Sequence, residues 1–409
     1  MDVATARREA LDRSLLLFGG LLHPGVGADR LDAHLAGFRV RIIATTGDRS
    51  TQTVLATIAS LIVRSGMQVI VNAPDLPTTT PLLGHGSLFA SLDAHIRDAM
   101  PGAQLQTDGG ADVTVAVGSA SRKADIWIGA GSTEARCANS ELAWQPGSEL
   151  AALGAAGLAA SEVHKAALRC LPVRHRTAGR LLQPTAATFD VGIASAPAVL
   201  GQLVMISGGA ITSAALWTLL AIPNLRAHVR VWDDDSVALS NLNRCLLFGM
   251  RHLGDRKVDA LATWSRADLV IEPVPMLFGA GDSLNGSTLV GADRIDARHH
   301  AQAARPPFLV VGATEGADIV LVSEHQPADP CAACLHPPHP VALGPVPTAS
   351  FVSFWAGFLA AVRLLRAQSG QMITSDQQVT RCYPLQPQSL VQEAIARRSD
   401  CGLCGADAA

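Results

Sequence analysis

The chain has 409 residues, of which 48% are apolar and only 16% are charged, and its formal net charge is −3. Its mean hydropathy is +0.25, and a chain this apolar can bury a large core, which excludes intrinsic disorder. The small net charge gives no overall basic footprint for nucleic acid, and the length suggests about two domains.

The N-terminal segment mixes acidic and basic residues and lacks the order of a secretory signal, in which a basic stretch precedes an apolar one. Eight cysteines are too few for a disulfide scaffold in a chain of this length. Four of them form two C-x-x-C pairs, which indicates a reducing compartment and a metal site. We therefore expect a cytoplasmic protein.

The first half of the chain has the pattern of a βαβ nucleotide-binding unit. An apolar strand begins near Phe38 and leads into a small polar turn at 45–50, a helix over about 51–64 and a second strand that ends at Asp75. The later elements predicted in this half are strands at 113–117 and 126–128, a polar loop at 131–147 and an Ala-rich helix at about 149–169.

The second half repeats this order. The pattern predicts a strand at 202–206, a turn at Ser207–Gly209, a helix at 212–222 and a strand at 229–232 that ends at three aspartates. The later elements predicted here are strands at 270–278, 287–290 and 308–312 and a small-residue-rich helix at 351–366. Two copies of one outline predict a pseudo-dimer within the chain, with a boundary in the stretch 171–200.

The stretch from Val191 to Leu225 contains no charged residue, and by hydropathy alone it is long enough to span a membrane. Gly208-Gly209 and Pro223 divide it into a short strand, a turn and a helix of about 11 residues, which is too short to cross a bilayer. Parallel strands that are buried on both faces are apolar throughout. We therefore expect no membrane segment here.

The sequence VWDDDSVALSNLNR, which ends at Arg244, concentrates polar side chains after a predicted strand. Acidic side chains at the end of the second strand of a βαβ unit are placed to bond ribose hydroxyls, which favours Asp233 and, less strongly, Asp235. Asn241, Arg244 and Lys257 follow on predicted helical segments, from which they could face the phosphates of a nucleotide. The alternative is a solvated acidic turn followed by surface charges.

This chain resembles the ubiquitin-activating enzymes and the ThiF/MoeB-type adenylyltransferases. That family has D-x-D-x-V-x-x-S-N-L-N-R, a lysine after a glycine, an aspartate at a strand end with an arginine five residues later, and two C-x-x-C pairs. The resemblance covers about 195–409, and its motifs occur in the family's order. The matching residues are Asp233, Asp235, Val237, Ser240 to Arg244, Gly254, Lys257, Asp293, Arg298, Cys331, Cys334, Cys401 and Cys404.

The resemblance implies an α/β fold of two tandem Rossmann-like, ThiF-type adenylation domains that form a pseudo-dimer, with a C-terminal zinc site. Residues 1–190 would be an inactive, degenerate adenylation domain and residues 191–409 the active one. Arg13 lies where family members have an arginine that reaches across the dimer to the ATP phosphates, and an ordinary helix charge is the alternative. Asp293 would hold Mg²⁺, so the implied cofactors are ATP, Mg²⁺ and Zn²⁺.

The turn after the strand at 202–206 departs from the family. The family pattern is G-x-G-G-x-G, whereas this chain has ISGGAI and keeps only Gly208 and Gly209. These two glycines still permit close approach of the backbone to a phosphate. The first half departs further, because no S-N-L-N-R sequence follows Asp75. ATP binding is therefore inferred mainly from the aspartate, arginine and lysine residues.

The two C-x-x-C pairs, Cys331/Cys334 and Cys401/Cys404, place two thiols each on one tight turn. Four thiolates complete the closed tetrahedral shell of a structural zinc ion. A redox dithiol is the alternative for one such pair, but two pairs flanked by proline and glycine favour zinc. The metal would pin the C-terminus to the Pro-rich loop at 336–347 and would not catalyse.

The other four cysteines bear on whether a thioester forms on this chain. Ubiquitin-type activating enzymes often have a nucleophilic cysteine soon after the first C-x-x-C, and this chain has none there. Cys137 lies in the predicted polar loop beside an arginine, which would favour a thiolate, and Cys245 directly follows Arg244. An inert thiol is the alternative for both, and we expect Cys170 and Cys382 to be packing residues.

The leading hypothesis from the sequence is ATP-dependent adenylation of the C-terminal carboxylate of a ubiquitin-like protein, followed by transfer to a thiol or a conjugating enzyme. A nearby alternative is a sulfur-carrier or peptide-adenylating ThiF-like enzyme, which uses the same chemistry. Alternatives of a different class are an NAD-dependent oxidoreductase and a non-catalytic scaffold. We expect no nucleic-acid partner, and oligomerisation beyond the pseudo-dimer stays open.

Overall fold

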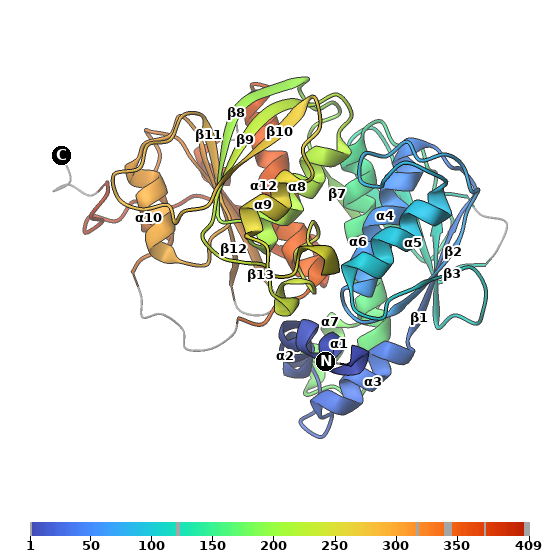
Figure 1. Cartoon of the computed structure of the whole chain (residues 1–409). Helices are drawn as coiled ribbons and strands as arrows, with labels where there is room; N and C mark the ends of the chain where they lie inside the picture. The colour runs from blue at the N-terminus through green and yellow to red at the C-terminus, as the bar shows by residue number, and fades with distance from the viewer. Residues whose placement is uncertain (1, 120–122, 316–318, 339–345, 372–373, 405–409) are drawn as a thin grey trace.

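Two β-sheets stand on either side of a central layer of helices in the computed structural model (Figure 1). The structure describes residues 2–119, 123–315, 319–338, 346–371 and 374–404. Each sheet is built from one half of the chain. Buried residues of both halves form one continuous apolar core, so the two sheets share an interior.

The first half begins with three short helices and then builds a seven-stranded sheet. Asp48 caps the helix after the first strand, because its side chain accepts a hydrogen bond from the backbone N–H of Thr51 at 3.0 Å. The elements are α1 (Val3–Ala10), α2 (Asp12–Leu21), α3 (Ala28–Gly37), β1 (Arg39–Ala44), α4 (Arg49–Val63), β2 (Gln68–Asn72), α5 (Leu88–Ala99), β3 (Leu105–Gln106), β4 (Val113–Val117), β5 (Ile126–Ala130), β6 (Glu134–Ala138), α6 (Glu149–Arg169), α7 (Arg176–Leu181) and β7 (Ala187–Asp190).

The second half builds an eight-stranded sheet. Strand β8, the middle one of its five parallel strands, is buried over its last four residues, as a parallel strand covered on both faces must be. The elements are β8 (Val199–Ile206), α8 (Ala210–Ala221), β9 (Arg226–Trp232), η1 (Leu239–Asn241), η2 (Met250–His252), α9 (Lys257–Ala262), β10 (Leu269–Val274), β11 (Ser287–Val290), α10 (Ile295–Ala303), β12 (Leu309–Glu315), β13 (Ile319–His325), α11 (Ala332–Leu335), α12 (Ser350–Gln368), η3 (Ser375–Gln377), β14 (Val379–Tyr383) and β15 (Gln386–Glu393).

The two sheets have the same topology over seven strands, and the second sheet has one further strand, β15. Their strand orders are β3-β2-β1-β4-β5-β6-β7 and β10-β9-β8-β11-β12-β13-β14-β15. In each sheet the first five strands of the order are parallel, and the strands after them are antiparallel. Each half is therefore a Rossmann-like α/β unit, and the predicted repetition of one outline is confirmed.

Several predicted bounds are wrong. The second strand ends at Asn72, three residues before Asp75. The expected polar loop at 131–147 contains β6, and the stretch 171–200 contains α7 and β7, which joins the first sheet. In β6 two residues are buried between the more exposed Glu134, Arg136 and Ala138, so this short alternating strand has the composition of a loop.

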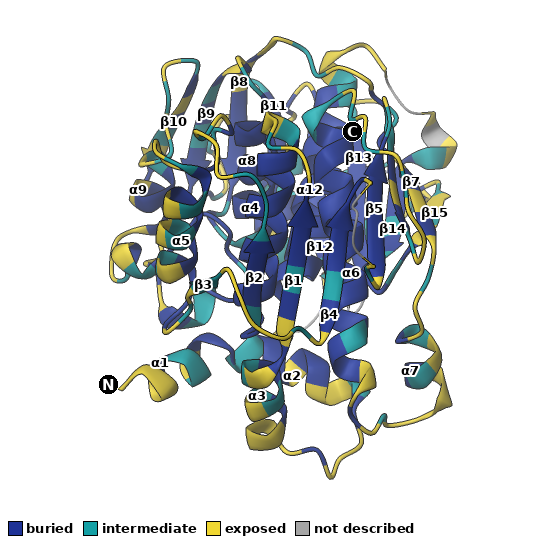
Figure 2. Ribbon diagram, turned by 90° about the vertical axis from the view of Figure 1, so that its right-hand side faces the viewer, coloured by how far each residue is buried: buried dark blue, intermediate teal, exposed yellow. Residues whose placement is uncertain are grey.

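The uncharged stretch 191–225 forms the end of the linker, β8, a turn and α8, as predicted. Among the described residues, α12 is the one helix long and apolar enough to cross a membrane, and 89% of its apolar window is buried inside the fold. Figure 2 shows α12 and α8 buried in the middle of the molecule. Burial against the other core elements accounts for the apolar character of both helices.

Helices α4, α6, α8 and α12 form the layer between the two sheets, with α12 packed on α8 and α6 packed on α4 (Figure 1). Small residues allow the helix backbones to approach closely. A Cβ added to Gly357 of α12 would lie 2.3 Å from the carbonyl oxygen of Ile211 in α8. Gly157 of α6 faces the rings of Phe354 and Trp355 of α12 in the same way.

Buried side chains also hydrogen bond across this layer. The indole of Trp217 donates to the hydroxyl of Thr57 at 3.1 Å, and the indole of Trp355 donates to Ser161 at 3.1 Å. His164 of α6 bonds the carbonyl oxygen of Ala160 at 2.6 Å and the hydroxyl of Ser65 at 2.7 Å. Burial lowers the pKa of His164 to about 4, so its neutral form is the one that the fold stabilises.

The change Gly357→Ala should destabilise the chain by about 1–3 kcal/mol, because the new methyl group would have to push α8 away from α12. The free energy of unfolding measured by urea titration tests this. The matched control is Gly19→Ala on α2, where a Cβ meets nothing within 4 Å. If both variants changed the free energy of unfolding equally, the close packing of α12 on α8 would be contradicted.

Stability should fall as the pH decreases from about 6.5 towards 4. A histidine with a lowered pKa in the folded state binds its proton more readily when unfolded, so acid favours unfolding, by about 1.4 kcal/mol per pKa unit. Burial lowers the pKa of His325 to about 4, as it does for His164. In urea titrations, the free energy of unfolding should decrease less steeply with falling pH in His164→Gln than in the wild type. The exposed His85→Gln should decrease as steeply as the wild type.

Candidate active site

The predicted nucleotide-binding residues lie at the carboxyl ends of three neighbouring strands. Ile206, Trp232 and Val290, the last residues of β8, β9 and β11, pair across the sheet, so the three strands end at the same level. The strand order reverses between β8 and β11. Ligands of doubly wound sheets bind at such a reversal, outside the carboxyl ends of the strands.

Asp233 joins the turn after β8 to the loop after β9. Its carboxylate accepts hydrogen bonds from the backbone N–H of Gly208 at 2.7 Å and of Asp235 at 2.9 Å. A Cβ on Gly208 would lie 3.3 Å from the Cβ of Lys257, so the glycine lets the turn and α9 approach each other. Asp233 is 7% exposed, whereas the side chain of Asp235 faces solvent.

Lys257 begins α9 and points back to these carboxylates. Its Nζ donates to Asp235 Oδ2 at 2.6 Å and lies 3.7 Å from Asp233 Oδ1. Burial alone would lower the pKa of Lys257, but the charge of Asp233 and the hydrogen bond to Asp235 outweigh it, and the pKa is raised. The lysine is therefore held as a cation beside the turn formed by Ser207 and Gly208.

The turn itself stores backbone strain. Ser207 adopts φ +80°, a conformation that favours glycine. Its hydroxyl accepts a hydrogen bond from the backbone N–H of Gly209 at 3.1 Å, which helps to hold the turn. Gly209 is the N-cap of α8, and because glycine has no side chain, no side-chain cap covers the first N–H groups of the helix.

Arg244 lies in the turns that follow η1. Burial lowers its pKa, the cation of Arg13 acts in the same direction, and the carboxylates of Asp12 and Asp293 oppose the shift. Arg13 belongs to α2 of the first half and is far from Asp293 in sequence, yet the charges of both residues act on Arg244.

Asp293 and Arg298 follow β11. Asp293 is exposed, and Arg298, on α10, donates to the carbonyl oxygen of Ala292 from Nε at 3.1 Å and from Nη2 at 2.9 Å. Burial lowers the pKa of Arg298 to about 10, and the charge of Asp293 opposes this shift. The arginine thus fixes the loop from which Asp293 projects.

Asn241 and Asn243 form different hydrogen bonds, and the sequence motif alone does not distinguish their roles. The side chain of Asn241 accepts a hydrogen bond from the backbone N–H of Ala238 at 2.9 Å, so in the described structure it supports the loop. Asn243 is fully buried, and its amide donates to the hydroxyl of Ser14 on α2 at 2.8 Å. Its Oδ1 accepts from Arg244 at 3.0 Å, which links Arg244 to the first half.

Arg64, at the C-cap of α4, was not predicted as part of the site. Its guanidinium is buried and donates to the carbonyl oxygens of Leu242 at 2.6 Å, Phe248 at 2.7 Å and Leu246 at 2.9 Å. These three residues surround Arg244 in sequence and belong to the other half. No sequence signal marks Arg64, because its partners are backbone groups 178 to 184 residues away.

Neither predicted thiolate is supported. Cys137 lies on β6 and is buried, and burial raises the pKa of its thiol, so the expectation of an activated cysteine in a polar loop is wrong. Cys245 is also buried, and burial raises the pKa of its thiol although Arg244 opposes the shift. Cys382 is buried on β14 as expected, whereas Cys170 is exposed and is not a packing residue.

The four cysteines of the two C-x-x-C pairs gather at one point, all sulfurs within 4.8 Å of one another. Cys331 Sγ lies 3.4 Å from Cys401 Sγ, and Cys334 Sγ lies 3.4 Å from Cys404 Sγ. Zn–S bonds of about 2.3 Å in a tetrahedron would separate the sulfurs by roughly 3.8 Å. The donor set and its spacing fit a structural zinc ion that joins α11 to the C-terminal segment. Residues 339–345 of the Pro-rich loop lie outside the described residues.

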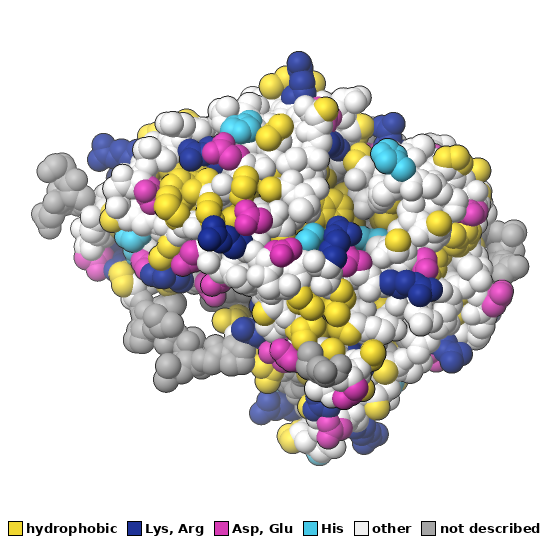
Figure 3. All heavy atoms as spheres, viewed as in Figure 1, with side chains coloured by type: hydrophobic (Ala, Val, Ile, Leu, Met, Phe, Trp, Pro, Cys, Tyr) yellow, Lys and Arg dark blue, Asp and Glu magenta, His cyan; other side chains and the backbone are white. Residues whose placement is uncertain are grey.

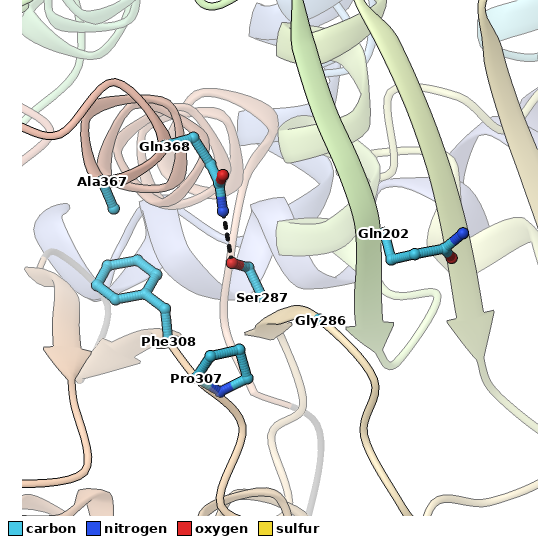
Figure 4. A pocket seen from close by; sticks show the side chains of 7 residues that line it. All are labelled: Gln202, Gly286, Ser287, Pro307, Phe308, Ala367 and Gln368. Atoms are coloured by element: carbon cyan, nitrogen blue, oxygen red, sulfur yellow. Dashed lines mark hydrogen bonds between the residues drawn. The ribbon is translucent and has the colours of Figure 1, made fainter.

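A cavity of about 360 Å³ lies at the opposite edge of the second sheet (Figure 4). Ser287, the first residue of β11, and Phe308, just before β12, line it, so it faces the amino ends of these strands. A hydrogen bond of 2.7 Å from Gln368 to Ser287 crosses it (Figure 4). The cavity is therefore separate from the residues at the carboxyl ends.

The face of the molecule in Figure 3 has basic and acidic side chains scattered among polar and apolar ones. They do not gather into one basic stripe on this face.

No family model matches the chain. The uncharacterized protein y4jF of Sinorhizobium fredii (strain NBRC 101917 / NGR234) is 29% identical over 150 residues, which are 35% of this chain and 29% of that protein. The chain thus matches less than a third of the length of that curated relative.

Similar solved structures include E. coli MccB with ATP, at 14% identity and a TM-score of 0.40 over 50% of this chain and 66% of that one. The microcin C7 biosynthetic enzyme MccB with N-formylated MccA has 14% identity and a TM-score of 0.42 over 56% and 74%. PaaA has 14% identity and a TM-score of 0.37 over 48% and 64%.

The purified chain should contain roughly one zinc ion, held by the four clustered thiols. Cys401→Ser should remove most of the zinc and lower the unfolding temperature, because the C-terminal segment would lose its attachment to α11. Elemental analysis and thermal unfolding measure both effects, with the exposed Cys170→Ser as control. Zinc content equal in Cys401→Ser and wild type would contradict this assignment.

Proposed function

We propose that the chain adenylates the C-terminal carboxylate of a peptide or protein at the expense of ATP, with residues 191–409 as the active adenylation domain. One observation carries this proposal: the turn at Gly208, the carboxylate of Asp233 and the cation of Lys257 are joined at the carboxyl ends of β8 and β9. The charges of Arg13 and Asp293 act on Arg244, and the charges of Arg244, Lys257 and Asp233 all act on the buried thiol of Cys245. An acidic ribose partner among phosphate-binding cations suits a nucleoside triphosphate.

The reaction is a displacement at the α-phosphorus of ATP. A carboxylate oxygen of the substrate forms a bond to that phosphorus, and the bond from the phosphorus to the bridging oxygen of the β-phosphate breaks. Pyrophosphate leaves with the electron pair, and an acyl-adenylate remains. Charge spreads over the phosphate oxygens during the step, so fixed cations stabilise it.

This chain's own residues orient and neutralise these groups. Asp233, and less surely Asp235, would accept hydrogen bonds from the ribose, and the backbone N–H groups after Gly208 and Gly209 would face a phosphate. Binding of the ribose at Asp235 would release Lys257 from its ion pair and free it for the phosphates. Arg244 would bind phosphate oxygens through its guanidinium.

Asp293 would hold Mg²⁺. Its carboxylate is exposed at the strand-order reversal and offers the oxygen ligand that this ion prefers. When bound, the ion would supply positive charge that offsets the negative charge of the phosphates. Arg298 keeps the loop in place through the carbonyl oxygen of Ala292. Asn241 supports the loop through its Oδ1, so its Nδ2 would be the group that donates to the nucleotide.

The first half, residues 1–190, is proposed to be the inactive domain. In its equivalent turn, Leu76 lies only 2.6 Å from where a Cβ on Gly47 would be. Gln52 donates to the carbonyl oxygen of Pro77 at 3.0 Å and accepts from the backbone N–H of Thr79 at 2.7 Å. The loop after β2 is therefore tied over the turn. Arg13 would be this half's direct contribution to the phosphates.

Two classes of substrate are considered, a peptide and a ubiquitin-like protein. The solved structures of MccB with ATP and with MccA accord better with the peptide-adenylating, ThiF-like alternative than with activation of a ubiquitin-like protein. Mass spectrometry after incubation with ATP and either a ubiquitin-like carrier or a short peptide separates these versions. An adenylate on one of them identifies the substrate class, and a reducible adduct of the chain would show transfer to a thiol.

A conjugating enzyme as partner, a cytoplasmic location and further oligomerisation stay predictions. So do the alternatives of an NAD-dependent oxidoreductase and a scaffold. Fluorescence titration with NADH and with an ATP analogue separates the oxidoreductase from the adenylyltransferase. Tight binding of NADH and none of ATP would contradict the proposed function.

Asp293→Asn should lower ATP–pyrophosphate exchange by roughly 10²-fold or more, because loss of one electrostatic partner of the reacting groups costs about this much. The assay needs the cognate substrate, identified as above. Asp296→Asn is the matched control, since Asp296 is an exposed carboxylate three residues away that pairs with Arg294. Full exchange activity in Asp293→Asn would contradict the role of Asp293.

A further inference from the structure

We infer that Arg64 is a positioning residue through which the first half holds Arg244 ready for phosphate binding. This inference rests on the proposed function, since it assigns a task within the same site. Arg64 is distinct from Arg13, because it is buried at the C-cap of α4 and faces backbone carbonyls of the other half.

The segment that carries Arg244, residues 242–253 (the Arg244 segment), needs such a partner. Between η1 and η2 the chain runs through turns without a continuous helix or a strand, yet Leu242, Cys245, Leu246, Leu247 and Phe248 are buried. Irregular backbone leaves carbonyl oxygens without partners inside the same segment, and buried carbonyls must be hydrogen bonded. The oxygens of Leu242, Leu246 and Phe248 find their donors in one guanidinium.

A guanidinium suits this place better than an ammonium. Nη1 donates to Leu242, and Nη2 donates to both Leu246 and Phe248, while Nε bonds the hydroxyl of Ser60 at 3.1 Å. The planar fork therefore fixes three points of the segment relative to α4 at once. A lysine at this position has a single nitrogen and cannot reproduce that geometry.

Other contacts from the first half act on the same segment, each at a single residue. Asn243 meets Ser14 of α2, as described above. Asp98 of α5 accepts the backbone N–H of Arg251 at 3.0 Å and pairs with its guanidinium at 3.1 Å. Arg64 is the contact that reaches both sides of Arg244, so we expect it to govern the position of that side chain most strongly.

The test compares Arg64→Met and Arg64→Lys with Thr57→Val in the full chain. Thr57 also makes a buried hydrogen bond across the halves, to Trp217, but it does not touch the Arg244 segment. The first readout is hydrogen exchange of the backbone amides from 242 to 253. The second is binding of ATP with Mg²⁺, and the third is ATP–pyrophosphate exchange with the identified substrate.

In Arg64→Met we expect faster exchange of these amides, while those of β1 and β8 stay protected. ATP should bind at least roughly tenfold more weakly, as expected when one hydrogen bond to a charged group is lost. The kcat should fall by roughly 10²-fold, since a displacement of about 1 Å has that effect. Arg64→Lys should lie between Arg64→Met and the wild type, and guanidinium ion below unfolding concentrations should partly rescue Arg64→Met.

Unchanged exchange at 242–253 or unchanged ATP affinity in Arg64→Met would overturn the inference. Equal loosening of this segment in Thr57→Val would also overturn it, because the effect would then belong to the interface in general. A wild-type chain that binds no ATP would instead overturn the proposed function, and hydrogen exchange would still decide whether Arg64 holds the segment.

Discussion

The rest of the structure depends on one buried positive charge, the guanidinium of Arg64, which lies between the two halves. Burial lowers the pKa of Arg64 to about 10, which still leaves the guanidinium charged at neutral pH. A buried charge is tolerated only when its donors are satisfied, and its main acceptors belong to the other half. Without it, three buried carbonyls would lose their donor, at a cost of about 1–3 kcal/mol each. Neither half therefore completes its interior alone.

The two halves share one fold, but different groups cover the turn after the first strand of each half, β1 or β8. In the first half, Gln52 and Leu76 close the turn after β1 with the loop that follows β2. In the second half, Asp233 and Lys257 hold the turn after β8 with charged groups that a nucleotide could engage. Helices α2, α4 and α5 of the closed copy, or their caps, contact the segment of the open copy that carries Arg244.

The sequence predicted those features that depend on local pattern. The apolar strands, the turn at Gly208 and the grouping of Asp233 with Lys257 follow from periodicity and motif spacing. Cys137 was misjudged because β6 alternates between buried and more exposed residues over only five positions, which composition does not distinguish from a loop. Arg64 and Asn243 could not be predicted, since their partners are backbone and hydroxyl groups far away in sequence, which only the packing of α4 and α2 on the second half brings near.

A structure of the chain with Mg²⁺ and a non-hydrolysable ATP analogue tests the central claim most directly. The account predicts the ribose at Asp233, the phosphates between the Gly208 turn and the side chains of Arg244 and Lys257, and Arg64 still bound to the carbonyl oxygens of 242–248. A nucleotide bound in the first half, or at the carboxyl ends of β8 and β9 without contact to Arg244 and Lys257, would contradict it.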